Sequence, residues 1–222
     1  MACPQPPQEA FPIDPLALAF NYPGGRVDLM ARRLDGAPRD LTPARASLAR
    51  LLVARRCGCN AAGIKIGHNP DGAPRIVAPA RALSLSLAGR DDLVAAAVAD
   101  GPLGVDIETI GAPVEPAFNV LHPAERAALA AAGAEAHAHF LWLWTLKEAY
   151  VKAIETGLSR EPAEIEIRRL DNLSPENFSL DAPASFRIFD CDRPVTTALA
   201  RAGRAIIGGR AAMVACVVLA RA

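Results

Sequence analysis

Short apolar segments separated by turn residues fill the chain from Ile64 to Glu108. Gly, Asp and Pro residues stand between the segments, as in HNPDGAP at 68–74, and the segments themselves are 64–66, 75–77, 82–88, 93–99 and 103–108. Short runs bounded by turn residues are typical of β-strands joined by tight turns. The sequence therefore predicts an antiparallel meander in this part of the chain.

Helical patterns flank the predicted strands. Before them, Thr42 can cap a helix, Pro43 suits its first position, and Arg55 and Arg56 suit its last turn. After them, one helix is expected from His122 to its end at Gly133, and a longer one over 139–156, closed by Gly157. Three further strands are predicted at 164–170, 185–191 and 211–219. The first 40 residues are expected to be irregular, with one short strand at 17–22.

A helix followed by antiparallel strands thus occurs in each half of the chain. This predicts an α+β fold built as a pseudo-two-fold pair of helix-plus-antiparallel-sheet lobes, with the active site between them. We expect residues 1–102 to form the N-terminal lobe and residues 103–222 the C-terminal lobe. Because one chain would supply both walls of the cleft, the sequence predicts a monomer.

Charge and composition exclude several classes of partner. Of 222 residues, 24 are Lys or Arg and 24 are Asp or Glu, so the net charge favours neither nucleic acid nor a membrane surface. The longest apolar run, 211–220, is about half of the roughly 20 residues that cross a bilayer. The N-terminus lacks the features of a secretory signal, and the five Cys are scattered. We therefore expect a cytoplasmic protein without a disulfide framework or a zinc site.

Lysine is scarce, and its placement is informative. Only three of the 24 basic residues are Lys, and Lys147 and Lys152 both fall in WTLKEAYVK at 144–152, beside the two Trp of the chain. An ammonium can take part in proton transfer, whereas a guanidinium stays charged. This window is therefore the first candidate for chemistry.

Acidic residues gather at two places. In LGVDIE at 103–108, strand alternation puts Asp106 and Glu108 on one face. Taken alone, they fit the solvated face of a half-exposed strand, and the alternative is a Mg²⁺ site. Glu148 and Lys152 are i,i+4 neighbours, which taken alone fits a surface ion pair. Together, three carboxylates and a scarce Lys suit a metal-bound pyrophosphate and its leaving group.

GVDIE at 104–108, followed by WTLKEAYVK at 144–152, resembles the paired signature of phosphopantetheinyl transferases of the long, single-chain, surfactin-synthetase-activating type. Weaker similarity runs from about Arg45 to Leu219. The resemblance implies transfer of the 4'-phosphopantetheine arm of coenzyme A to a serine of an acyl or peptidyl carrier protein, with Mg²⁺ as cofactor. It also implies that coenzyme A lies in the cleft between the lobes.

The resemblance assigns roles to individual residues. Either Glu148 or metal-bound water would be the base for the carrier serine, and Lys152 would stabilise or protonate the leaving group. Glu125 matches an acidic residue of the connecting helix. The implied metal ligands are Asp106, Glu108 and Glu148. The implied coenzyme-binding residues are Arg45, Arg50, Arg75, Ser86, Lys147 and Lys152.

The chain also departs from the family pattern. Where the family has Phe-Asn-Leu-Ser-His-Ser, this chain has LSLSLA at 83–88, so Leu87 replaces the His that helps to hold the 3'-phosphate. Ala73 replaces a basic turn residue, and Glu155 replaces the first Gly after the long helix. Compensation is expected from Arg45, Arg50 or Arg75, and His68 is taken as a turn residue. The departures keep one alternative open, a catalytically inactive homologue that binds a carrier protein or nucleotide.

Overall fold

A computed structural model describes residues 15–36, 38–111, 117–156, 159–170, 179–180 and 186–220. Two expectations lie outside these ranges, in whole or in part: the irregular conformation of residues 1–14 and the helix end at Gly157. None of the helices in the described ranges is long and apolar enough to cross a membrane.

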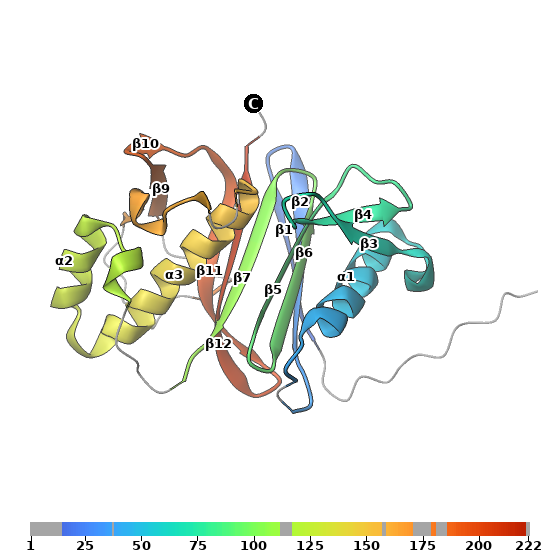
Figure 1. The fold of residues 1–222 in the computed structure, drawn as a ribbon, viewed down its shortest axis with the longest axis horizontal. Coiled ribbons are helices and arrows are strands. Elements are labelled where there is room, and N and C mark those ends of the chain that lie inside the picture. Colours follow the sequence, from blue (N-terminus) through green and yellow to red (C-terminus); the bar gives the residue numbers. More distant parts are fainter. Residues whose placement is uncertain are drawn as a thin grey trace, which may run out of the picture.

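Two antiparallel sheets form the centre of the molecule (Figure 1). The four-stranded sheet has the order β1-β2-β6-β5, with β1 at Leu16–Tyr22, β2 at Gly25–Arg33, β6 at Leu93–Ala99 and β5 at Ser84–Arg90. The three-stranded sheet has the order β11-β12-β7, with β11 at Thr197–Ile207, β12 at Arg210–Leu219 and β7 at Leu103–Thr109. Antiparallel pairing is confirmed, but the predicted meander over 64–108 is wrong, because β7 pairs with β12 in the second sheet and not with β6.

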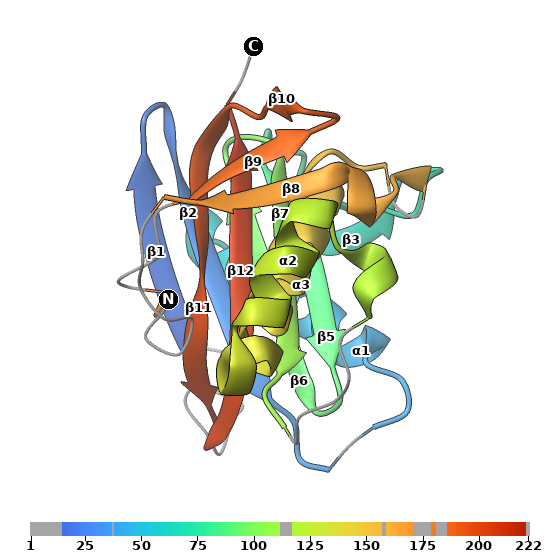
Figure 2. The ribbon, with the colours of Figure 1, turned by 90° about the vertical axis from the view of Figure 1, so that its left-hand side faces the viewer.

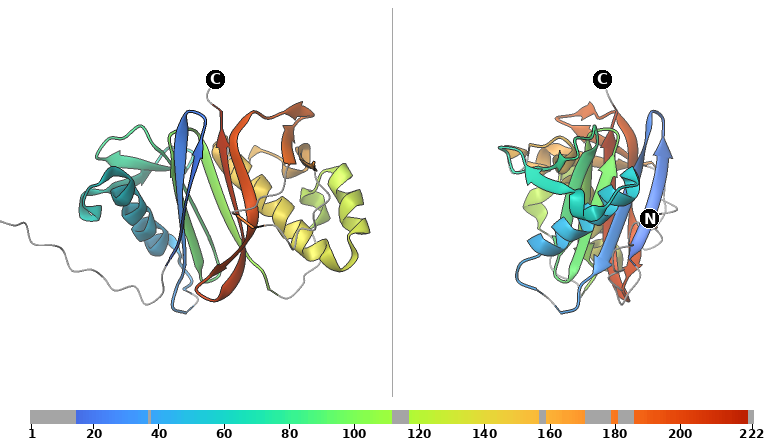
Figure 3. Two further views of the ribbon diagram at one scale, coloured as in Figure 1. Left: turned by 180° about the vertical axis from the view of Figure 1, so that it is seen from behind. Right: turned by 90° about the vertical axis from the view of Figure 1, so that its right-hand side faces the viewer.

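The two sheets share a core, and each carries a helix on its other side, as views from the front and from behind show (Figures 1 and 3). Helix α1 (Thr42–Cys57) covers the four-stranded sheet through Leu48, Leu52 and Val53. Helix α3 (Ala136–Ala153) covers the three-stranded sheet, and α2 (Pro123–Ala131) lies beside α3. Between the sheets, Ala-rich β6 packs with β2 against β7 and β12. The result is a helix–sheet–sheet–helix arrangement.

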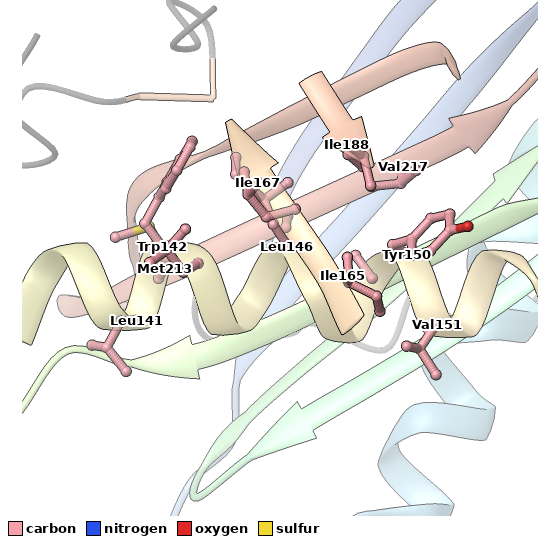
Figure 4. Packing of buried hydrophobic residues seen from close by; sticks show 14 of the residues in the cluster. Leu141, Trp142, Leu146, Tyr150, Val151, Ile165, Ile167, Ile188, Met213 and Val217 are labelled. Atoms are coloured by element: carbon pink, nitrogen blue, oxygen red, sulfur yellow. The ribbon is translucent and has the colours of Figure 1, made fainter. Parts of the chain in front are cut away.

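Two smaller sheets lie outside these layers. The hairpin of β3 (Lys65–His68) and β4 (Pro74–Ala78) lies beside α1 and β5. A second small sheet has the order β10-β9-β8, with β8 at Ile165–Arg169, β9 at Phe186–Asp190 and β10 at Arg193–Pro194 (Figure 2). Figure 4 shows the packing around α3, where Trp142, Leu146 and Tyr150 lie among Ile165, Ile167, Ile188, Met213 and Val217. Short 3₁₀ turns occur at Ala61–Gly63, Phe118–Val120, Gly133–Glu135 and Pro162–Glu164.

The structure corrects three local expectations. Thr42 is the first residue of α1 rather than its cap, because its N–H donates to the Asp40 carboxylate at 2.8 Å. The first 40 residues are not irregular throughout, since β2 crosses the four-stranded sheet and is buried on both faces, which removes the alternation that would have marked it. Strand β11 was also missed. The class, mixed α and β with antiparallel sheets, is confirmed, while the pseudo-two-fold relation between lobes stays a prediction.

Candidate active site

Strand β7 has two faces with different surroundings. Val105 and Ile107 are buried in the core between the sheets, whereas Gly104, Asp106 and Glu108 face α3. A Cβ at Gly104 would lie 1.7 Å from the carbonyl oxygen of Ala149, so the helix rests directly on the strand at this glycine. The predicted alternation is confirmed, and it places both acids beside the helix that carries Glu148 and Lys152.

Asp106 is the most deeply buried acid of the group. Only 6% of the residue is exposed, and Oδ1 accepts a hydrogen bond from Lys152 Nζ at 2.6 Å. Lys152 also donates to the carbonyl oxygen of Val105 at 3.2 Å. Burial raises the pKa of Asp106, and the Lys152 charge opposes that rise. Oδ2 is buried without a hydrogen bond from any described residue, which is costly for a carboxylate oxygen and leaves it available to a cation.

Glu108 lies one pleat further along the same face. Its Oε1 accepts a hydrogen bond from Trp144 Nε1 at 3.0 Å, and its Oε2 lies 3.3 Å from Arg90 Nε at the end of β5. Burial raises the pKa of Glu108, and repulsion from Asp106 adds to the rise. Trp144, expected on the apolar side of the helix, instead turns its indole N–H to this acid. Arg90 had not been singled out in the sequence, because an arginine at a strand end carries no signal of its own.

Glu148 completes the group from the helix side. Its side chain is partly buried, and its pKa is raised by burial and then by the charge of Asp106, while Lys152 opposes the rise. Asp106 raises the pKa of both Glu108 and Glu148, and Glu148 adds to the rise at Glu108, so the three acids lie in the same region between β7 and α3. Within the described ranges, no three His, Cys, Asp or Glu side chains are arranged closely enough to hold an ion. The types of donor are nevertheless those that Mg²⁺ prefers, because all three side chains are carboxylates and the buried Asp106 Oδ2 accepts no hydrogen bond from a described residue.

A cavity lies where α1, the β3–β4 hairpin and β5 meet. It has a volume of about 260 Å³ and is lined by Thr42, Arg45, Ala46, Ile66, His68, Gly72, Pro74 and Leu87. Arg45 Nη2 donates to Thr42 Oγ1 at 3.2 Å. The cavity brings Arg45 and Leu87 together and also includes His68, which had been taken as a turn residue. Arg50 is not among the residues that line it.

Arg75 lies next to this cavity but has a partner within the protein. It belongs to β4, beside Pro74, and its guanidinium donates to the carboxylate of Glu155, two residues beyond the end of α3. This contact raises the pKa of Arg75. The ion pair joins residues 80 positions apart in the chain.

Two predicted site residues lie elsewhere. Ser86 is buried between β5 and β7, where its Oγ accepts a hydrogen bond from the Val105 N–H at 3.0 Å. Lys147 has no exposed surface and pairs with Glu125 at 2.6 Å. Burial lowers the pKa of Lys147, and Glu125 opposes this effect. The structure therefore does not bring Lys147 to the acids or to the cavity.

Comparison with known proteins supports the family resemblance for one part of the chain. No curated protein matches it. The segment that supplies Asp106, Glu108, Glu148 and Lys152, residues 102–200, matches the family model of the 4'-phosphopantetheinyl transferase superfamily over somewhat less than half of the chain.

Proposed function

We propose that this protein transfers the 4'-phosphopantetheine arm of coenzyme A to a serine of an acyl or peptidyl carrier protein, as a transferase of the long, single-chain type. The observation that carries the proposal is the carboxylate group around Asp106 Oδ2. It contains three acids and a lysine from β7 and α3, and it lies within the segment that matches the superfamily.

Asp106, Glu108 and Glu148 would hold Mg²⁺. When bound, the ion would neutralise charge on the pyrophosphate of coenzyme A. The protein part of the proposed site is a set of oxygen donors whose mutual repulsion a divalent cation would relieve.

Glu148 and Lys152 would handle the protons and charges of the reaction. The serine oxygen forms a bond to the phosphorus that carries the pantetheine arm, and the bond from that phosphorus to the bridging oxygen of adenosine 3',5'-bisphosphate breaks. The serine proton passes to Glu148, a carboxylate of the helix side of the site that can act as a general base. Lys152 neutralises the leaving phosphate with the ammonium that now contacts Asp106.

The cavity beside α1 would receive the nucleotide end of coenzyme A. Arg45 is its cationic wall, and Ile66, Pro74 and Leu87 are its apolar walls. We further propose that the two lobes meet between residues 102 and 103 with a pseudo-two-fold relation, and that the chain acts as a cytoplasmic monomer.

A second candidate is a non-catalytic homologue that binds a carrier protein or nucleotide. It is favoured by Leu87, which offers no donor to a phosphate, and by Arg75, which is held by Glu155. The retained carboxylate group argues for the transferase.

The test is incubation of the protein with coenzyme A, Mg²⁺ and a panel of apo carrier proteins, followed by intact mass measurement. We expect one or more carriers to gain the mass of the phosphopantetheine arm. Glu148→Gln should reduce the rate by about 10²–10⁴-fold, the usual contribution of a general base. Glu161→Gln, at an exposed residue outside the site, is the matched control. No gain on any carrier, with a known transferase succeeding in parallel, would favour the non-catalytic homologue.

A further inference from the structure

The ion pair between Arg75 and Glu155 connects the β3–β4 hairpin to the C-terminal end of α3. Figure 1 shows the hairpin reaching toward that end of the helix across the line where β5 and β7 meet. About a third of each side chain is exposed, 39% for Arg75 and 34% for Glu155. The pair is therefore open to solvent and to a dissolved anion, unlike a core ion pair.

Glu155 is held in an unusual backbone conformation. Its φ is +57°, in the left-handed region that glycine, or less often asparagine, occupies after a helix. Its N–H donates to the carbonyl oxygen of Lys152 at 3.3 Å, so the turn is fixed to the last residues of α3. A glutamate in this position is unfavourable for the backbone. Its carboxylate nevertheless contacts the guanidinium of Arg75 on β4.

Chain neighbours link Arg75 and its partner to the cavity and to Lys152. Its neighbour Pro74 lines the cavity that contains Arg45 and His68. Its partner Glu155 follows, by three residues, the Lys152 that contacts Asp106. The ion pair thus joins a strand that lines the cavity to the helix that carries Lys152. A guanidinium fork binds phosphate and carboxylate oxygens with the same bidentate geometry.

From these contacts we infer that Glu155 is an internal substitute for a substrate phosphate. Without ligand, its carboxylate holds Arg75 and ties the hairpin to α3. A pyrophosphate-bearing ligand binds by replacing Glu155 as the partner of Arg75. Glu155 therefore weakens ligand binding and anchors the hairpin. A substitution of Glu155 alters both effects without removing a residue of the proposed chemistry. The choice of coenzyme A as ligand rests on the proposed function, while the anchoring of the hairpin does not.

The first experiment examines the anchor without ligand. Hydrogen exchange is measured over residues 65–78 for the wild type, Glu155→Gln and Arg75→Gln, with Glu161→Gln and Arg81→Gln as controls that make the same charge changes at exposed residues. Exchange should be faster in both Glu155→Gln and Arg75→Gln and unchanged in the controls. Equal exchange in all five proteins would overturn the inference.

The second experiment measures competition by calorimetry in Mg²⁺-free buffer, with coenzyme A and inorganic pyrophosphate as separate ligands. Glu155→Gln should bind each ligand about 3-fold or more tightly than the wild type, because exposed ion pairs of this kind are weak but not negligible. Arg75→Gln should bind about 10-fold more weakly, as expected for the loss of charge-assisted hydrogen bonds. In the double variant, the gain from Glu155→Gln should disappear.

These outcomes separate the inference from the proposed function. Unchanged or weaker binding in Glu155→Gln would overturn the inference, and so would a gain that persists without Arg75. Glu155→Gly, which also removes the left-handed side chain, should give at least the same gain and guards against an effect peculiar to glutamine. Tighter binding in these variants, with no carrier protein ever gaining the arm, would support the internal competitor and contradict the transferase.

Discussion

The Glu125 carboxylate and the Lys147 ammonium lie 2.6 Å apart, with 3% and 0% of the two side chains exposed. Lys147 also donates to the carbonyl oxygens of Val120 and Pro162. Glu125 in turn accepts hydrogen bonds from the N–H groups of His122 and Ile167, at 2.8 and 2.7 Å. The pair thus joins α2, α3 and β8 through a polar network within the protein.

We predict that Lys147 supports the fold and not coenzyme binding. Lys147→Met should lower the free energy of unfolding by about 3–5 kcal/mol, because a buried carboxylate is left without its counter-charge. Urea unfolding at pH 7 measures this, with Lys65→Met, at an exposed lysine, as the control. Adding Glu125→Gln to the Lys147→Met protein should recover part of the loss. Unchanged stability combined with loss of coenzyme A affinity would restore the binding role that the sequence predicted.

Gly104 should tolerate no side chain. Gly104→Ala places a methyl group 1.7 Å from the Ala149 carbonyl oxygen, so α3 must move away from β7. We expect a loss of about 1–3 kcal/mol or more from overpacking, together with a loss of transfer activity as Glu148 separates from Asp106. Thermal unfolding and the carrier assay measure the two effects. Gly63→Ala, where nothing lies within 4 Å of the new Cβ, should change neither.

Trp144 should report cation binding. Its Nε1 donates to Glu108 at 3.0 Å, whereas Trp142 is fully buried. Titration with Mg²⁺ alone should change the tryptophan emission of the wild type, because the ion would compete for the Glu108 carboxylate. The change should disappear in Trp144→Phe and in Asp106→Asn. An unaltered response in Asp106→Asn would place the cation elsewhere.

His139 should make stability depend on pH. Burial and, to a smaller extent, the charge of Arg169 lower its pKa from 6.5 to about 4, against the opposing charge of Glu135. Because the unfolded chain binds the proton more readily, this contribution to stability is present above about pH 6.5 and is lost as the pH falls toward 4. The urea midpoint should therefore fall between pH 7 and pH 4.5, and His139→Gln should reduce that fall. An equally steep fall in the variant would assign it to other groups.

Residue patterns within a single segment were enough to predict some of the helices and strands. Helix α1 was predicted from Pro43 and its terminal arginines, and the two faces of β7 from simple alternation. Strand β11, with its mixture of Arg, Gly and Ala, is defined by pairing with β12 and could not be recognised alone. Scarcity of lysine identified Lys152, which lies at the candidate site, and equally Lys147, which does not. Only the packing of the folded chain distinguishes the lysine at the candidate site from the one in the core.

The contact between Arg75 and Glu155 was beyond sequence reasoning for a related reason. Glu155 was noted as a departure from a glycine, and Arg75 as a possible phosphate ligand, but nothing in either segment indicates that they meet. Contacts between residues 80 positions apart depend on how the hairpin lies against α3, which follows from the packing of both sheets.

Successive side chains of strand β7 alternate between two surroundings, the core between the sheets and the side that faces α3. Val105 and Ile107 pack against the four-stranded sheet, and the intervening Asp106 faces α3. Any substitution that shifts this strand to improve the fit between the sheets also shifts the acids, because the peptide units are shared. Selection for thermal stability is therefore expected to avoid β7 and to accumulate changes at the outer strands β1 and β11, where backbone movement is not transmitted directly to Asp106.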